Sequence, residues 1–217
     1  GNAPSLEVHL RGMVVIHKPA DWEVDGNGGL LQSGDHPPLS AYVQSIFPSE
    51  RFPVCWDSEQ SYGFLHRLDI PSSGLILAGT TYEGYFWLRS QLDTQRVQRE
   101  YVVVCRDLAC SALRTVAARV DVAPDPSQRK SISDCGKPSQ TLVSVQAHVV
   151  GRSDFDEGPM SVVVIRIFTG RRHQIRVHMR HSNHPTVADA RYACRQVFLN
   201  SKEKGGLGFQ RAEALRW

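Results

Sequence analysis

The sequence predicts an α+β fold, with a mainly antiparallel mixed sheet and flanking helices. Short β-branched runs such as "REYVVV" and "MSVVVIRIF" are frequent, and they do not alternate regularly with helical segments as βαβ units would. Two such runs, at 140–150 and 160–168, follow each other around a polar turn, which is typical of antiparallel neighbours. A chain of 217 residues with 41% hydrophobic residues can bury a sizeable core.

The first half of the chain contains four predicted elements. A strand over 13–19 is stopped by Pro19, and a short helix over 37–47 begins at two prolines and carries apolar residues at helical spacing. An apolar strand is expected over 74–80. The segment 82–95 predicts an amphipathic helix whose inward face carries Tyr82, Phe86 and Leu92.

The second half is predicted to contain most of the sheet. Strands are expected over 99–105, 114–122, 140–150 and 160–168, with a hairpin at 151–158 joining the last two. The segment 170–181 then turns into a helix. Residues 197–217 fit no pattern that we can place.

Composition and the absence of certain motifs argue against several classes of protein. No stretch approaches the roughly 18 apolar residues of a membrane helix. The five cysteines form no CxxC pair, which favours reduced, half-buried thiols in an intracellular protein over a zinc ribbon or a redox motif. A P-loop and a dinucleotide fingerprint are also missing, so we expect neither cofactor nor metal.

Arginines concentrate in one segment. Between Arg166 and Arg195 there are seven arginines and four histidines against a single acid, Asp189. Such a run is often a solvated face, but the guanidinium group suits phosphate recognition, so a nucleic-acid partner becomes a fair hypothesis. Arg176, between Ile175 and Val177, needs a carboxylate partner if it is buried. Asp69 and Asp189 are both candidates.

Five segments in order resemble the RluA-type pseudouridine synthases, which convert uridine in RNA into its C-linked isomer. The first is "MVVIHKPADWEV", where Asp21 replaces an expected Gly. Then come "HRLDIPSSGLILAGT", "REYVVV" and "GRRHQIRVHM", where Arg172 replaces a Thr. The last is "NHPTVADARY", which resembles a Gly-His-Pro-x-x-Gly-Asp-x-x-Tyr pattern. Together they span residues 13–192.

The resemblance implies the fold of that family's catalytic domain and three catalytic residues. Asp69 would be the nucleophile, Arg176 would favour its charged form, and Tyr101 would offer a flat face to uracil and a hydroxyl to move a proton. The base must leave its stack to reach the pocket. The expected substrate-binding residues are His66, Arg67, Leu68, Ile175, Arg171, Arg172 and Arg180, of which the last three would meet phosphates.

The domain prediction is an N-terminal extension over 1–12 and one catalytic domain over 13–217, without an S4-like RNA-binding module. The expected partner is RNA, with no membrane and no metal, and the protein is expected to be a monomer. The compartment within the cell, whether cytoplasm, nucleus or organelle, is left open, because the sequence does not begin with Met and a targeting segment could have been removed.

Two other functions compete with this one. A catalytically inactive RNA-binding or RNA-folding module would keep the fold, but retention of Asp69, Tyr101 and Arg176 argues against it. A metallohydrolase would use His173, His178, His181 and His184, whose spacing fits no HExxH-type template.

Overall fold

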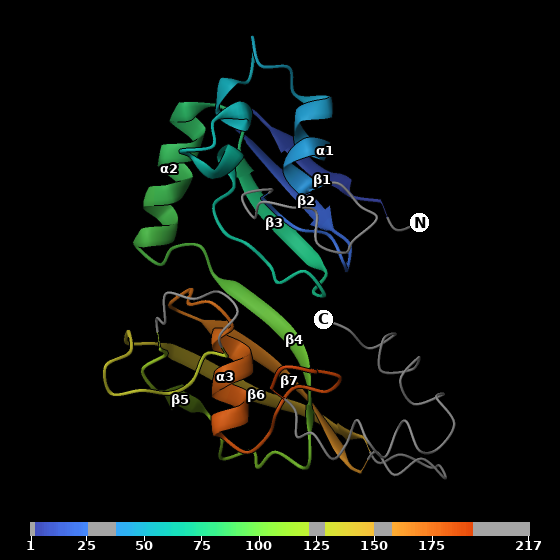
Figure 1. Ribbon diagram of the computed structural model, residues 1–217, viewed down its shortest axis with the longest axis vertical. Helices are drawn as coiled ribbons and strands as arrows, with labels where there is room; N and C mark the ends of the chain where they lie inside the picture. Colours follow the sequence, from blue (N-terminus) through green and yellow to red (C-terminus); the bar gives the residue numbers. More distant parts are fainter. Residues whose placement is uncertain (1–2, 26–37, 122–128, 150–157, 193–217) are drawn as a thin grey trace. The chain divides into compact units, whose positions relative to one another are not determined.

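The computed structural model describes residues 3–25, 38–121, 129–149 and 158–192. The described residues fall into two compact units, one up to Val97 and the other from Gln98 on. Figure 1 shows both, and each is described by itself. Both combine an antiparallel sheet with helices, so the α+β prediction is confirmed.

The sheet of the first unit has three strands in the order β1-β2-β3. They are β1 (Ser5–Leu10), β2 (Met13–Lys18) and β3 (Gly74–Gly79), and both pairs are antiparallel. Along β2 every second residue is buried, namely Val14, Ile16 and Lys18. This period of two is that of a strand with one face against a core, and it places a lysine on the inward face.

Helices cover the sheet of this unit (Figure 1). They are α1 (Leu39–Ile46) and α2 (Tyr82–Asp93), with two short 3₁₀ turns, η1 (Pro53–Trp56) and η2 (Ser61–Gly63). The hydroxyl of Thr81 accepts a hydrogen bond of 3.1 Å from the backbone N–H of Gly84 and so caps the start of α2.

The predicted inward face of α2 is wrong at Tyr82 and Phe86, whereas Leu92 is half-buried. Tyr82 and Phe86 are 41% and 55% exposed, whereas Tyr85 and Leu88 are buried. Apolar residues occur on both sides of this helix, and packing decides between them. A Cβ atom on Gly79 would lie 2.5 Å from the Cα atom of Tyr85, so the end of β3 admits the backbone of α2 at this turn only because residue 79 has no side chain.

The second unit contains a four-stranded antiparallel sheet in the order β4-β7-β6-β5. Its strands are β4 (Arg99–Arg106), β5 (Thr115–Ala117), β6 (Gln140–Val149) and β7 (Met160–Ile167). The expected pairing of the last two strands is confirmed, although their connection lies outside the described residues. The strand expected over 114–122 is shorter, because Val120 makes only isolated bridges to Ile132 and Lys137.

Helix α3 (Gln174–His181) packs on one face of this sheet (Figure 1). Met179 is fully buried and joins the core formed by residues of all four strands, among them Val103, Val163 and Ile165. A second, smaller cluster joins Val177 to residues outside the helix, namely Val120 and Tyr192. The helix is therefore fixed by both clusters.

Three positions where the resemblance expects glycine carry other residues in a left-handed backbone conformation. Asp21 has φ 68°, Asn183 φ 62° and Ala188 φ 60°. Asp and Asn tolerate this region, but alanine adopts it only at a cost of about 1 kcal/mol or more. These three positions thus keep the left-handed backbone conformation although none of them is a glycine.

The cysteine prediction is confirmed in part. Cys55 and Cys105 are buried, and burial raises the pKa of their thiols to about 11 and about 12 respectively. Cys110 and Cys135 are exposed free thiols, and Cys194 lies outside the described residues. Along the described ranges, every helix is too short or too polar to cross a bilayer.

Candidate active site

Asp69 lies in the loop that leads into β3. The segment before this loop is tied to β3 by two hydrogen bonds: Leu65 N–H donates to the carbonyl of Leu77 at 3.1 Å, and Leu77 N–H donates to Nε2 of His66 at 3.2 Å. At the tip, Ser72 N–H donates to the carbonyl of Asp69 at 2.9 Å. The loop is therefore a closed turn, and Asp69 is half-buried in it.

Lys18 holds this turn by hydrogen bonds to backbone carbonyl groups. Its side chain is fully buried, and its Nζ donates to the carbonyl oxygens of Pro19, Trp22 and Ile70 at 3.0, 2.8 and 3.1 Å. The carbonyl of Ile70 also accepts from the backbone N–H of Asp21 at 2.7 Å. Two donors thus hold the carbonyl of Ile70, the residue after Asp69, and all three protons of the ammonium have an acceptor.

The charge of Lys18 is costly to bury and is attracted by nearby carboxylates. Burial lowers the pKa of its ammonium from 10.5 to about 8, while the charges of Asp21 and Asp69 act in the opposite direction. At neutral pH the group is therefore still a cation. It places a buried positive charge near the carboxylate expected to be the nucleophile.

The other residues predicted at this loop have different surroundings. Leu68 is buried, His66 is half-buried, and Arg67 is exposed. The Arg67 side chain is 65% exposed and lies 3.3 Å from Asp25, a surface ion pair that contributes at most about 1 kcal/mol. Arg67 can therefore be recruited by another anion at little cost.

In the second unit, a buried amide fixes the start of α3. Gln174 is 2% exposed, and its side-chain oxygen accepts from the Thr169 hydroxyl at 2.8 Å and the Arg171 N–H at 3.1 Å. Its side-chain nitrogen donates to the carbonyl of Gln140 and the hydroxyl of Thr141, both at 3.0 Å. The arginines at 171, 172 and 180 are exposed around this helix, as expected of phosphate contacts.

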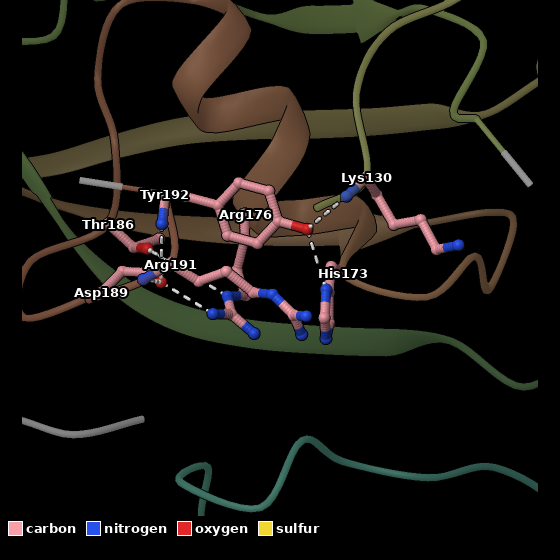
Figure 2. A network of polar contacts seen from close by, with 7 residues as sticks. All are labelled: Lys130, His173, Arg176, Thr186, Asp189, Arg191 and Tyr192. Carbon is pink, nitrogen blue, oxygen red and sulfur yellow. Dashed lines mark hydrogen bonds and ion pairs between the residues drawn. The ribbon is translucent and has the colours of Figure 1, made fainter. Parts of the chain in front are cut away.

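Arg176 forms a two-pronged ion pair with Asp189 (Figure 2). Its Nε and Nη2 each lie 2.7 Å from a different carboxylate oxygen of Asp189. Asp189 also accepts from the Thr186 hydroxyl at 2.9 Å and from the backbone N–H groups of Arg191 and Tyr192 at 3.0 and 3.1 Å. Burial would raise the pKa of Asp189, but these donors outweigh it and hold the pKa below its ordinary value.

Tyr192 covers the same guanidinium. Its ring centroid lies 4.7 Å from Cζ of Arg176, within the range of a cation–π contact. Its hydroxyl lies 2.8 Å from Nδ1 of His173 and accepts from the backbone N–H of Lys130 at 3.1 Å. Figure 2 shows these residues as one connected network. Of the two carboxylates considered for Arg176, Asp189 is thus the one that this unit supplies.

Tyr101 and Ile175 both pack against the core of the second unit. Tyr101 stands on β4 opposite Ile165 of β7, and Ile175 lies in the first turn of α3. Each is half-buried, so each keeps part of its side chain accessible. This is a suitable state for a residue that contacts a base.

The four histidines considered as metal ligands are engaged in other ways. His178 is fully buried between the Thr141 hydroxyl at 2.8 Å and the Ala118 carbonyl at 3.1 Å, and burial lowers its pKa. His173 contacts Tyr192, Nδ1 of His184 lies 3.1 Å from the carbonyl of Arg106, and His181 is exposed. Among the described residues, no group of three potential ligands is placed to hold a metal ion.

Sequence reasoning missed the roles of Lys18, His173 and Tyr192. The alternation of β2 contained a signal for the first, because a lysine follows two inward residues, Val14 and Ile16, at the same spacing. Tyr192 closes the "NHPTVADARY" segment, whose likeness to the family pattern does not by itself give the tyrosine a role. Nothing local to His173 predicts its contact.

The sequence model of the family described as "RNA pseudouridylate synthase" matches residues 12–181. The chain belongs to this family. The RluA-type resemblance is therefore confirmed, and curated relatives agree with it. Ribosomal large subunit pseudouridine synthase C of Buchnera aphidicola subsp. Schizaphis graminum is 28% identical over 194 residues, which are 88% of this chain and 55% of the relative. Ribosomal large subunit pseudouridine synthase D of Xylella fastidiosa is 33% identical over 130 residues, which are 60% of this chain and 37% of the relative.

Solved structures show the same fold. Human RNA Pseudouridylate Synthase Domain Containing 1 has a TM-score of 0.66 at 21% identity, covering 90% of this chain and 72% of that one. Human RNA Pseudouridylate Synthase Domain Containing 4 has a TM-score of 0.64 at 16% identity, covering 98% and 80%. The chain spans about half the length of the curated synthases C that it matches.

Proposed function

We propose that the protein is an RNA pseudouridine synthase that isomerises uridine in structured RNA, with Asp69 as its nucleophile. One observation carries the assignment of Asp69 beyond family membership. The Asp69 turn is held by a buried cation, Lys18, which donates to the carbonyl of Ile70 at 3.1 Å. A turn that needs only to connect two strands does not require a buried charge, which costs several kcal/mol to desolvate.

The reaction makes limited demands on the protein. The N1–C1′ bond of uridine breaks, the uracil rotates, and a C5–C1′ bond forms. The proton at C5 then leaves and N1 takes up a proton, so the product is an isomer of the substrate. Atoms and electrons balance without an oxidant or an energy source. The difficult step is cleavage of the glycosidic bond, which a carboxylate can promote by covalent attachment to the nucleoside.

The three catalytic residues take complementary roles. Asp69 acts as the nucleophilic carboxylate, and Arg176 contributes a positive charge to the reaction. Asp189 binds two of the five N–H donors of the Arg176 guanidinium and so fixes its edge. Tyr101 lies against the uracil and moves a proton through its hydroxyl.

RNA binding falls to the residues around these three. The target base flips out of its stack into the site. Arg171, Arg172 and Arg180 are exposed and would meet phosphates, which provides salt-dependent affinity with little sequence choice. The other proposed substrate-binding residues lie in the two segments that carry Asp69 and Arg176. They are His66, Arg67, Leu68 and Ile175. Because relatives are named for the ribosomal large subunit, its RNA is the first substrate to test.

The test is mass-spectrometric mapping of pseudouridine in RNA that was made without modification and incubated with the protein. We expect wild type to produce discrete sites, and Asp69→Asn to lower the rate by at least about 10⁴-fold, as removal of a covalent nucleophile does elsewhere. Asp93→Asn is the matched control, because it removes an exposed carboxylate of the same unit that pairs with the exposed Arg89.

Two results would contradict the proposal. Pseudouridine formed by Asp69→Asn at a rate near that of wild type would remove Asp69 from the nucleophile role. Absence of pseudouridine with wild type, in every RNA that it binds tightly, would refute the activity itself. RNA binding by Asp69→Asn should stay within a few-fold of wild type, because the change removes one charge from a half-buried turn.

A further inference from the structure

The segment that follows α3 encloses the Arg176 guanidinium on two sides (Figure 2). Asp189 binds its edge through two contacts of 2.7 Å, and the ring of Tyr192 covers its face at 4.7 Å. An arginine held at its edge and at its face loses most of its rotational freedom. We refer to Asp189 and Tyr192 together as the arginine clamp.

The edge of the clamp is itself fixed. Asp189 is 8% exposed, and its carboxylate accepts three further hydrogen bonds from its own segment, one from Thr186 and two from backbone N–H groups. A carboxylate with five donors has little room to turn. These contacts come from the protein itself, so the carboxylate is preorganised and does not need RNA to hold it in place.

The face of the clamp is fixed from two other segments. Tyr192 is 2% exposed, and its hydroxyl is bound by the backbone N–H of Lys130 and by Nδ1 of His173. Because the hydroxyl accepts from Lys130, it can donate its own proton to a neutral His173. The ring is thus anchored at its far end while its face rests on Arg176.

Stability alone does not account for this arrangement. A buried ion pair is often no better for stability than apolar residues of similar volume, because desolvation offsets the attraction. What the pair and the ring do supply is one defined orientation of a cation. Reactions that depend on such a charge are sensitive to its placement, since a shift of about 1 Å costs on the order of 100-fold in rate.

We propose that Asp189 and Tyr192 are positioning residues that hold Arg176 in its reactive orientation. The proposal rests on the proposed function, in which Arg176 takes part in uridine isomerisation. Neither residue needs to touch RNA. Their effect passes through Arg176, so their loss should lower the rate of the chemical step more than the affinity for RNA.

Four variants test this. Asp189→Asn removes the charge at the edge, Tyr192→Phe removes the hydroxyl anchor but keeps the ring, and Tyr192→Leu removes both. Glu100→Gln is the matched control, because Glu100 forms an exposed pair with Arg166 in the same unit, with a contact of 2.6 Å. Thermal unfolding of each variant identifies those that fail to fold.

The first readout is single-turnover pseudouridine formation at saturating protein, with the Kd for RNA measured separately. We expect Asp189→Asn to lower the rate by about 100-fold and Tyr192→Phe by about tenfold, with Kd within about threefold. Combining Asp189→Asn with Arg176→Lys should cost little more than Arg176→Lys alone, because both act on one group. Fully additive losses, or rates equal to that of Glu100→Gln, would overturn the proposal.

The second readout does not need activity. The Arg176 Nε–H signal in ¹⁵N NMR, assigned by its loss in Arg176→Lys, should exchange slowly with solvent in wild type and rapidly in Asp189→Asn and Tyr192→Leu. An unchanged signal in folded variants would overturn the clamp. If wild type modifies no RNA, the proposed function fails, while this readout still decides whether the clamp positions Arg176.

Discussion

Substitution of Lys18 by methionine gives the sharpest test of the Asp69 turn. Methionine keeps much of the length of the side chain but removes the ammonium that donates to three carbonyl oxygens. Because Lys18 is fully buried, its charge is desolvated in the folded protein and hydrated in the unfolded chain. The stability of wild type should therefore depend on pH in a way that the variant does not.

The magnitude follows from the pKa. Burial lowers the pKa of Lys18 from 10.5 to about 8, a difference that corresponds to about 3.4 kcal/mol. Between these two values the unfolded chain binds more protons than the folded one, so the free energy of unfolding rises with pH. Relative to Lys18→Met, wild type should gain about 2.5 kcal/mol between pH 7 and pH 10, with almost no change below pH 7.

Two measurements check this. Titration of lysine ¹³Cε signals by NMR reports the pKa of Lys18 directly, with the signal assigned by its loss in Lys18→Met. Urea denaturation at pH 7 and pH 10, followed through amide signals of β2 and β3, reports the unfolding free energy of the unit that contains Lys18. Lys137→Met is the control, because Lys137 is exposed.

A Lys18 signal that titrates near 10.5 would contradict this prediction, since the ammonium would then be hydrated and could not be the buried support of the turn. A stability difference between wild type and Lys18→Met that is the same at pH 7 and pH 10 would contradict it equally. A difference that appears also with Lys137→Met would assign the effect to net charge.

Three further predictions follow from single features. Ala188→Gly should raise the free energy of unfolding by about 0.5–1 kcal/mol, because glycine adopts a φ of 60° without strain, which outweighs its greater chain entropy in the unfolded state. A lower free energy of unfolding, measured by urea denaturation, would contradict this. Leu88→Ala should lower the free energy of unfolding by about 2–4 kcal/mol, and Phe86→Ser should lower it by less than about 0.5 kcal/mol. The reverse order would mean that Phe86, and not Leu88, faces the core. Replacing Arg171 and Arg172 together by alanine should lower the slope of log Kd for RNA against log salt by about one for each phosphate that is no longer neutralised; an unchanged slope would place both away from RNA.

Local patterns predicted most of the elements because strand and helix periods are written in neighbouring residues. The run 160–168 is an example: its β-branched residues alternate between the core and the other face of β7. The prediction failed where two faces were equally apolar. In α2, Tyr82 and Phe86 repeat at helical spacing as well as Tyr85 and Leu88 do, and only packing of the helix against Gly79 chooses between the pairs.

The candidate site divides in the same way. The residue types that carry chemistry, Asp69, Tyr101 and Arg176, stand in recognisable motifs and were predicted with their roles. The groups that surround them were not. Lys18 precedes Asp69 by 51 positions and bonds to the residue after it, and no periodic pattern relates positions so far apart.

The sequence by itself determined the family and the candidate catalytic residues, because these depend on short motifs whose order survives in a single chain. The tertiary structure decided that Asp189 pairs with Arg176, since its carboxylate reaches the guanidinium only when the chain turns back beside α3. It also decided that Lys18 is buried and that Tyr192 lies on the guanidinium. Burial and partner choice are properties of packing between distant segments, and hydrogen bonds and desolvation fix them only once those segments have come together.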